Sequence, residues 1–294
     1  MTRFTLNKTA AALALATATL PAAQAAGPQL NLSVYNPADK AIFPVSSSLV
    51  TGKHDAILID AQFARKDAEA LVKQIKDSGK TLTTVYISHG DPDYYFGLDT
   101  IKAAFPNARV LATGPTIAHI KATMNQKLAF WGPKLGNDAP ARLIVPEPIK
   151  GDTLKLEGRE LKVIGVDGAR SELSVVWIPS LRTVTGGVPV VGNQHVWMAD
   201  SKTPEARKTW KQTLDRISAL HPVKVVPGHY LPGAKLDLTS VRFTRDYIDA
   251  IETELPKAAD SKALVEAMKL RYPNLGGEAD LELGAKVLKG EMPW

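Results

Sequence analysis

The loop formed by residues 88–97 is the feature that most restricts what this chain can fold into. It reads Ser-His-Gly-Asp-Pro-Asp-Tyr-Tyr-Phe-Gly and follows an apolar run, residues 82–87, whose length and composition predict a buried strand. The polar side chains that leave the end of this strand are His89, Asp91, Asp93 and Tyr94. Because the chain has no cysteine, imidazoles and carboxylates are the zinc-binding side chains that remain to it.

Strand-like and helix-like patterns alternate along the chain. Short apolar runs flanked by turn residues predict strands, and apolar residues at helical spacing predict helices. The predicted strands span residues 46–51, 56–60, 82–87 and 110–112, two runs within 151–166, and residues 173–178 and 223–226. The predicted helices span residues 64–78, 98–105, 115–131, 203–220, 238–254 and 261–270. This alternation favours a layered α/β sandwich.

Four motifs together resemble the metallo-β-lactamase-fold hydrolases. Residues 88–97 are similar to the loop of that superfamily, which follows a buried strand and carries His-x-His-x-Asp-His. Residues 177–187 resemble its strand pair that ends in Gly-Asp, and residues 192–197 resemble a stretch of one secreted bacterial branch. Residues 225–229 end in Pro-Gly-His, like its last ligand motif. The order and spacing of these motifs imply a four-layer αββα sandwich over most of the mature chain.

The resemblance also implies a metal-ligand set that is only partly preserved. His89, Asp93 and His229 match ligand positions of a two-zinc member, and Asp91 stands where the loop has its second histidine. These four residues are therefore the predicted metal ligands. Tyr94 replaces the last histidine of the loop.

Two further ligand positions differ from the superfamily pattern. Gly187 stands where a carboxylate bridges the two metal ions, and Ala169 or Arg170 stands where a third histidine belongs. Zinc in a catalytic site has three protein ligands and one open position. Because even the loss of a supporting residue weakens metal binding by about 10–100-fold, we expect one zinc or other divalent ion at most, or none. Nearby acids and histidines are available to complete a single site: Asp167, Glu172, His195 and Asp200.

Two classes of function remain open. The first is a hydrolase that cleaves an ester, amide or lactone with a depleted metal site; its candidate catalytic residues are Asp93, Tyr94 and His195. Asp93 beside a histidine would act in proton transfer, and Tyr94 would hydrogen-bond the developing oxyanion. The second is a non-catalytic relative that binds a small molecule or a protein in the same cleft. Structural roles compete with both, since Asp91 and Asp93 also suit the N-terminus of a helix, and His119 suits a packed or exposed helix position.

Composition and the N-terminus predict an exported protein. Residues 1–25 carry basic residues before an Ala/Leu-rich run and end in Ala-Gln-Ala, as signal peptides do. We therefore expect a periplasmic or secreted protein that leaves the membrane after cleavage, with one domain at 26–255 and a helical extension at 256–294 packed on it. The formal charge of +6 is dispersed, which disfavours nucleic-acid binding and leaves a small molecule as the expected partner.

Overall fold

The computed structural model describes residue 1 and residues 29–165 and 171–293. Nearly all of the predicted signal peptide, residues 1–25, lies outside the described residues. So do Asp167, Ala169 and Arg170, which the sequence places near the site.

The first sheet has six strands in the order β1-β2-β3-β4-β5-β6. Their bounds are Asn31–Tyr35 (β1), Ser47–Thr51 (β2), Asp55–Ile59 (β3), Thr81–Ile87 (β4), Arg109–Ala112 (β5) and Glu147–Pro148 (β6). β1, β2 and β3 pair antiparallel, whereas β3 to β6 run parallel and are joined by crossovers that contain helices. The carboxyl ends of β3, β4 and β5 therefore meet at one edge of this sheet.

The second sheet has five strands in the order β12-β10-β9-β8-β7. Their bounds are Thr153–Leu156 (β7), Arg159–Ile164 (β8), Val175–Ile178 (β9), Thr183–Thr185 (β10) and Lys224–Val225 (β12). A separate parallel pair joins β11, Val191–Gly192, to β13, His229–Tyr230.

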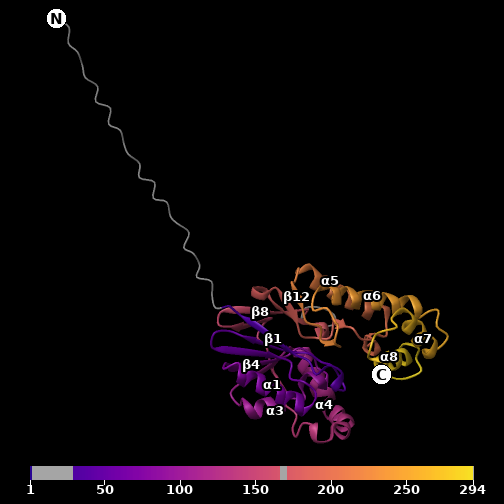
Figure 1. The fold of residues 1–294 in the computed structure, drawn as a ribbon, viewed down its shortest axis with the longest axis horizontal. Helices are drawn as coiled ribbons and strands as arrows, with labels where there is room; N and C mark the ends of the chain where they lie inside the picture. The colour runs from indigo at the N-terminus through magenta and orange to yellow at the C-terminus, as the bar shows by residue number, and fades with distance from the viewer. Residues whose placement is uncertain (2–28, 166–170, 294) are drawn as a thin grey trace.

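Helices cover the outer face of each sheet (Figure 1). On the side of the first sheet lie α1 (Arg65–Asp77), α3 (Leu98–Ala104) and α4 (Gly114–Leu135). On the side of the second lie α5 (Pro204–Ala219) and α6 (Leu238–Glu254), followed by α7 (Ser261–Arg271) and α8 (Glu278–Leu288). The short helix α2 spans Pro92–Tyr95, and 3-10 turns span Ala38–Lys40, Gly136–Asp138, Ser171–Leu173, Pro179–Leu181 and Ala199–Ser201.

Three hydrophobic clusters fill the spaces between four layers. In β3, Ile57 and Ile59 belong to the cluster shared by the two sheets, whereas Ala56 and Leu58 belong to the cluster beneath α1 and α3. This alternation follows from the two-residue period of a strand, which sends successive side chains to opposite faces. A third cluster joins the second sheet to α5, α6, α7 and α8. The arrangement confirms the predicted four-layer αββα sandwich.

Most predicted elements are present, with small differences at their ends. The sequence missed the edge strand β1, the two-residue strands β6, β11 and β13, and the last helix, α8. The described residues of the predicted extension, 256–293, contain α7 and α8, which bury Leu264, Met268 and Leu281 in the same cluster as α6. None of the helices in residues 29–165 and 171–293 combines the length and apolar character that a bilayer span requires.

Candidate functional site

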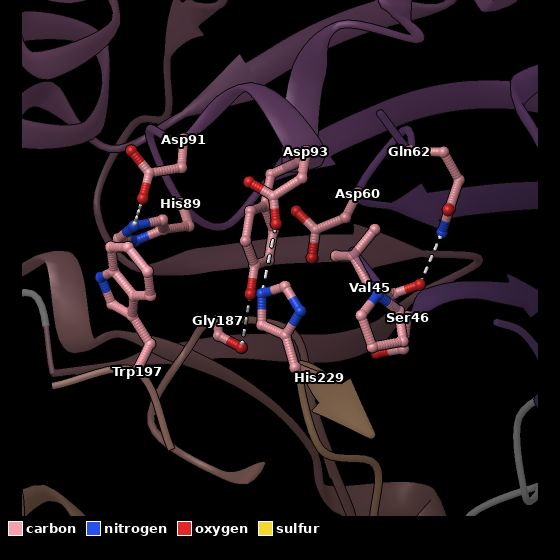
Figure 2. Close-up of polar contacts among 12 residues, drawn as sticks. Val45, Ser46, Asp60, Gln62, His89, Asp91, Asp93, Gly187, Trp197 and His229 are labelled. Atoms are coloured by element: carbon pink, nitrogen blue, oxygen red, sulfur yellow. Dashed lines mark hydrogen bonds and ion pairs between the residues drawn. The ribbon is translucent and has the colours of Figure 1, made fainter. Parts of the chain in front are cut away.

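The loop after β4 turns directly into α2, with Asp91 at the N-cap position and Pro92 as the first helical residue. Proline favours that position because its fixed φ suits a helix start. The Asp91 side chain makes no capping hydrogen bond to α2. It points instead toward His89, so the helix-capping interpretation of this residue does not hold (Figure 2).

His89 is held on both of its ring nitrogens. Nε2 lies 3.2 Å from Asp91 Oδ2, and Nδ1 lies 3.1 Å from the backbone oxygen of Glu172. Burial alone would lower the pKa of His89, but the Asp91 and Asp93 carboxylates overcome this effect and raise it to about 8. At neutral pH the imidazole is therefore largely a cation paired with Asp91.

Helix α4 brings two further side chains to Asp91. The helix starts at a cap in which Thr113 Oγ1 accepts the Thr116 N–H at 3.2 Å. Further along α4, the Lys127 ammonium hydrogen-bonds Asp91 Oδ1 and lies 3.0 Å from His119 Nε2. Burial would raise the pKa of Asp91, but the charge of His89, the hydrogen bonds from His119 and His89, and the Lys127 ammonium hold it well below its usual range.

A second histidine–carboxylate pair lies across the site. His229 Nε2, on β13, is 3.2 Å from Asp93 Oδ2, on α2. Figure 2 shows this pair and the His89–Asp91 pair as two separate contacts. The four residues predicted as ligands thus come together at one place, but as two pairs.

Tyr94 lies between the two histidines and is fully buried. Its ring centroid is 5.2 Å from that of His89 and 5.6 Å from that of His229, with edge-to-face geometry in both cases. The hydroxyl donates to the backbone oxygen of Gly187 at 3.4 Å. An aromatic ring therefore occupies the space between the imidazoles, and its hydroxyl is already bonded to the protein.

Gly187 cannot be replaced by the missing bridging carboxylate in this backbone. Its φ is +75°, and a Cβ atom there would lie 2.0 Å from the backbone oxygen of Ser174, far inside any van der Waals contact. Its N–H donates to Ser88 Oγ at 2.7 Å, and Ser88 Oγ donates in turn to the buried carboxyl of Asp60 at 2.7 Å. This chain of hydrogen bonds fixes Gly187 in its place.

The described residues do not fit a resident zinc ion. No group of three or more histidine, aspartate or glutamate side chains suited to a metal occurs in residues 29–165 and 171–293, whereas zinc needs three protein ligands. Asp91, the acid beside His89, is already neutralised by Lys127, and Tyr94 fills the space between His89 and His229. The metal-ligand roles of the four predicted residues remain a sequence prediction.

The site opens into a cleft of about 540 Å³. This volume lies within the range of about 300–1,000 Å³ typical of small-molecule pockets. Its floor contains both histidine–carboxylate pairs, and its walls include Phe43, Trp131, Leu173, Val188, Trp197 and Trp210. The cleft thus joins a charged floor to largely apolar walls.

His195 takes no part in the cleft lining. It is 1% exposed, and its Nδ1 lies 2.9 Å from the Tyr247 hydroxyl. Burial lowers its pKa. The structure therefore does not bring His195 together with Asp93 and Tyr94.

Three cleft residues were missed by the sequence analysis. His119, predicted to be a packed or surface residue, and Lys127 both contact Asp91 from α4. Asp280, on α8, lines the cleft near Asp93 and His229. Helical periodicity puts His119 and Lys127 on one face of α4, but nothing in the sequence shows that this face packs against the end of β4.

Comparison with known proteins identifies the family. The sequence profile described as the metallo-beta-lactamase superfamily matches residues 42–229, which is more than half of the chain. The chain belongs to this superfamily. Superfamily membership and the αββα sandwich together make it a hydrolase-like protein.

Solved structures share the fold at low sequence identity. A metallo-beta-lactamase family protein from Thermus thermophilus superposes with a TM-score of 0.61 and 16% identity, covering 90% of this chain and 93% of that one. A metallo-beta-lactamase from Pontibacter korlensis gives 0.53 and 19%, covering 76% and 95%. The uncharacterized protein YobT of Bacillus subtilis (strain 168) is 31% identical over 71 residues, which span 24% of this chain and only 30% of that protein.

Proposed function

We propose that this superfamily member binds a small organic molecule in its cleft without a resident metal ion, as an exported protein of the periplasm or the medium. The observation that carries the proposal is the position of Tyr94 and Lys127. The Tyr94 ring lies between His89 and His229, and the Lys127 ammonium supplies positive charge to Asp91. These contacts support the proposal because Lys127 offers Asp91 positive charge that a divalent ion would otherwise supply.

The walls of the cleft suit an apolar ligand body. Phe43 packs edge to face on Trp131, with ring centroids 5.1 Å apart, and Trp131 also contacts Phe63. This aromatic group forms a rigid wall that needs no ordering when a ligand binds, so little conformational entropy is lost. Apolar area removed from water contributes about 25 cal/mol per Å² to such binding.

Hydrolysis of an ester, amide or lactone is a second candidate, favoured by the Asp93–His229 pair on the cleft floor. With Asp93 accepting from Nε2–H, His229 carries its lone pair on Nδ1, where it would take a proton from water as that water attacks the carbonyl carbon. The proton would then pass to the leaving group. Tyr94 would not assist as predicted, because its buried hydroxyl already donates to Gly187.

Metal analysis and an activity screen on untagged protein test the proposal. We expect zinc far below one ion per chain, and no change in ligand binding when a chelator is added. Stoichiometric zinc in protein purified without added metal would contradict the proposal.

The second candidate is tested with aryl esters, anilides and lactones. Turnover that is unaffected by chelator and is lost in His229→Ala would support metal-free hydrolysis. His54→Ala is the matched control, because His54 is exposed in the turn between β2 and β3. Turnover that survives in His229→Ala would exclude the Asp93–His229 pair as the catalytic group.

A further inference from the structure

The cleft lining is acidic, although the whole chain is basic, with a formal net charge of +6. Among the described residues of this lining, the charged ones other than histidine are five carboxylates and two lysines: Asp91, Asp93, Glu172, Asp200, Asp280, Lys127 and Lys202. The net charge of these described residues stays negative even when His89 is protonated. A concave surface of one charge sign concentrates its field in the cavity, so this cleft attracts cations.

Asp280 is the carboxylate whose charge is least compensated. It lies on α8, and its side chain has no hydrogen-bond or ion-pair partner among the residues that the structure describes. Burial raises its pKa to about 6; His229 opposes the rise and Asp93 adds to it. A positively charged ligand group would relieve the cost of this half-buried, unpaired carboxylate.

A second unpaired acceptor lies beside Asp280. Gln194 is 3% exposed and lines the cleft, and its Oε1 has no hydrogen-bond partner within the described part of the chain. Both side chains flank Gly277. A Cβ atom built at that glycine would lie 3.4 Å from Gln194 Cβ and 3.5 Å from Asp280 Oδ2. The Gln194 amide oxygen is buried, so the Asp280 carboxylate is the unpaired acceptor that this part of the lining offers to a ligand.

Aromatic side chains form part of the cleft lining as well. Three of the five tryptophans of the chain line the cleft: Trp131, Trp197 and Trp210. Figure 2 shows Trp197 on the side of the site where His89 and Asp91 lie. Its indole N–H donates to Asp200 at 2.7 Å, which fixes the ring. These rings offer a large apolar surface to the carbon skeleton of a ligand.

We infer that the ligand is a protonated amine on an apolar body, with an N–H group directed at Asp280 and its carbon skeleton against the tryptophans. This inference rests on the proposed binding function and names its ligand class. An anionic ligand fits less well. Lys127, the lysine on the cleft floor, is already bonded to Asp91, so an anion there would face that carboxylate.

Calorimetric titration of the full chain with four eight-carbon probes tests the inference: octylammonium, octyltrimethylammonium, octanol and octanoate. We expect octylammonium to bind about tenfold more tightly than octanol, which lacks the charge, and than octyltrimethylammonium, which lacks the N–H donors. Octanoate should bind least, because its charge has the sign of Asp280. Asp280→Asn should lower the octylammonium affinity about tenfold and leave that of octanol unchanged. Glu282→Gln is the matched control, because Glu282 lies exposed on the same helix and does not line the cleft.

The outcomes separate this inference from the proposed function. If octanol or octanoate binds as tightly as octylammonium, or if Asp280→Asn has no effect, the ligand class is wrong while binding in the cleft stands. If none of the four probes binds, both the ligand class and small-molecule binding by the cleft are contradicted.

Discussion

Replacing Lys127 by methionine tests whether a side-chain ammonium has taken over the role of a metal ion in this fold. The substitution keeps much of the aliphatic stem and the helix propensity of α4, but removes the charge that contacts Asp91 and the hydrogen bond to His119. Within the described part of the chain, the imidazoles of His89 and His119 then remain as the contacts of the Asp91 carboxylate.

The expected loss follows from the exposure of the pair. A contact of opposite unit charges gains about 4 kcal/mol at an effective dielectric constant of 20, before desolvation is subtracted. The Lys127 and Asp91 side chains are 22% and 34% exposed, so the net value lies between that of a surface pair and that of a buried one. We expect Lys127→Met to destabilise the fold by about 1–2 kcal/mol, or about 3–6 °C in melting temperature.

Urea unfolding of a double-mutant cycle measures this coupling. Asp91→Asn, Lys127→Met and the double variant should give a coupling energy of about 1 kcal/mol. Lys121→Met is the matched control, because it removes the same charge from an exposed position of α4 and should change stability by less than about 0.5 kcal/mol. A coupling energy near zero, or equal effects of the two lysine substitutions, would refute the idea that Lys127 supplies the charge of a metal ion.

Three further predictions follow from the same site. Gly187→Ala should cost about 3 kcal/mol or more in unfolding free energy, because its Cβ would strike Ser174, whereas Gly79→Ala, at φ +65° with open space, should cost about 1 kcal/mol. Burial raises the pKa of Asp60 to about 7 against the opposing Ser88 hydrogen bonds. Asp60 therefore contributes fully to stability when the pH is below 3.8, the pKa of this group in the unfolded chain. That contribution is lost as the pH rises toward 7, its pKa in the folded protein. Urea unfolding at about pH 5 and about pH 8 should show a smaller difference for Asp60→Asn than for the wild type. Addition of zinc or of chelator should leave the melting temperature of the wild type unchanged, since an ion that binds only the folded state would raise it.

Sequence patterns predicted most of the fold because its layers depend on local periodicity. The run 82–87 has the length and apolar character of a buried strand, and it forms β4. The helix predicted at 238–254 corresponds to α6. β1 escaped prediction because it is an edge strand in which no residue is fully buried, so its apolar pattern is weak.

The sequence predicted the site residues that belong to a recognisable motif and missed the others. His89, Asp91, Asp93 and His229 lie in recognisable loops, and they meet because their strands end at the same side of the sandwich. Lys127 could not be predicted in the same way. Its contact with Asp91 depends on which face of α4 lies over the end of β4. Tertiary packing determines that orientation, and the residues around Lys127 in the sequence do not indicate it.

The replacements at the metal positions form one connected structure. Tyr94, which the sequence resemblance places at a histidine position, donates to the backbone of Gly187, which it places at the bridging carboxylate. The absence of a side chain at Gly187 is what permits its close approach to Ser174. The tyrosine at position 94 and the glycine at position 187 therefore depend on each other, because the Gly187 backbone accepts the Tyr94 hydrogen bond from a position that a larger residue could not occupy. For this reason Tyr94→His alone should not restore a metal site: it would remove the donor to Gly187 while Lys127 still neutralises Asp91 and no carboxylate bridges the histidines. Zinc binding by this single variant, measured by equilibrium dialysis, would show that the replacements are independent of one another.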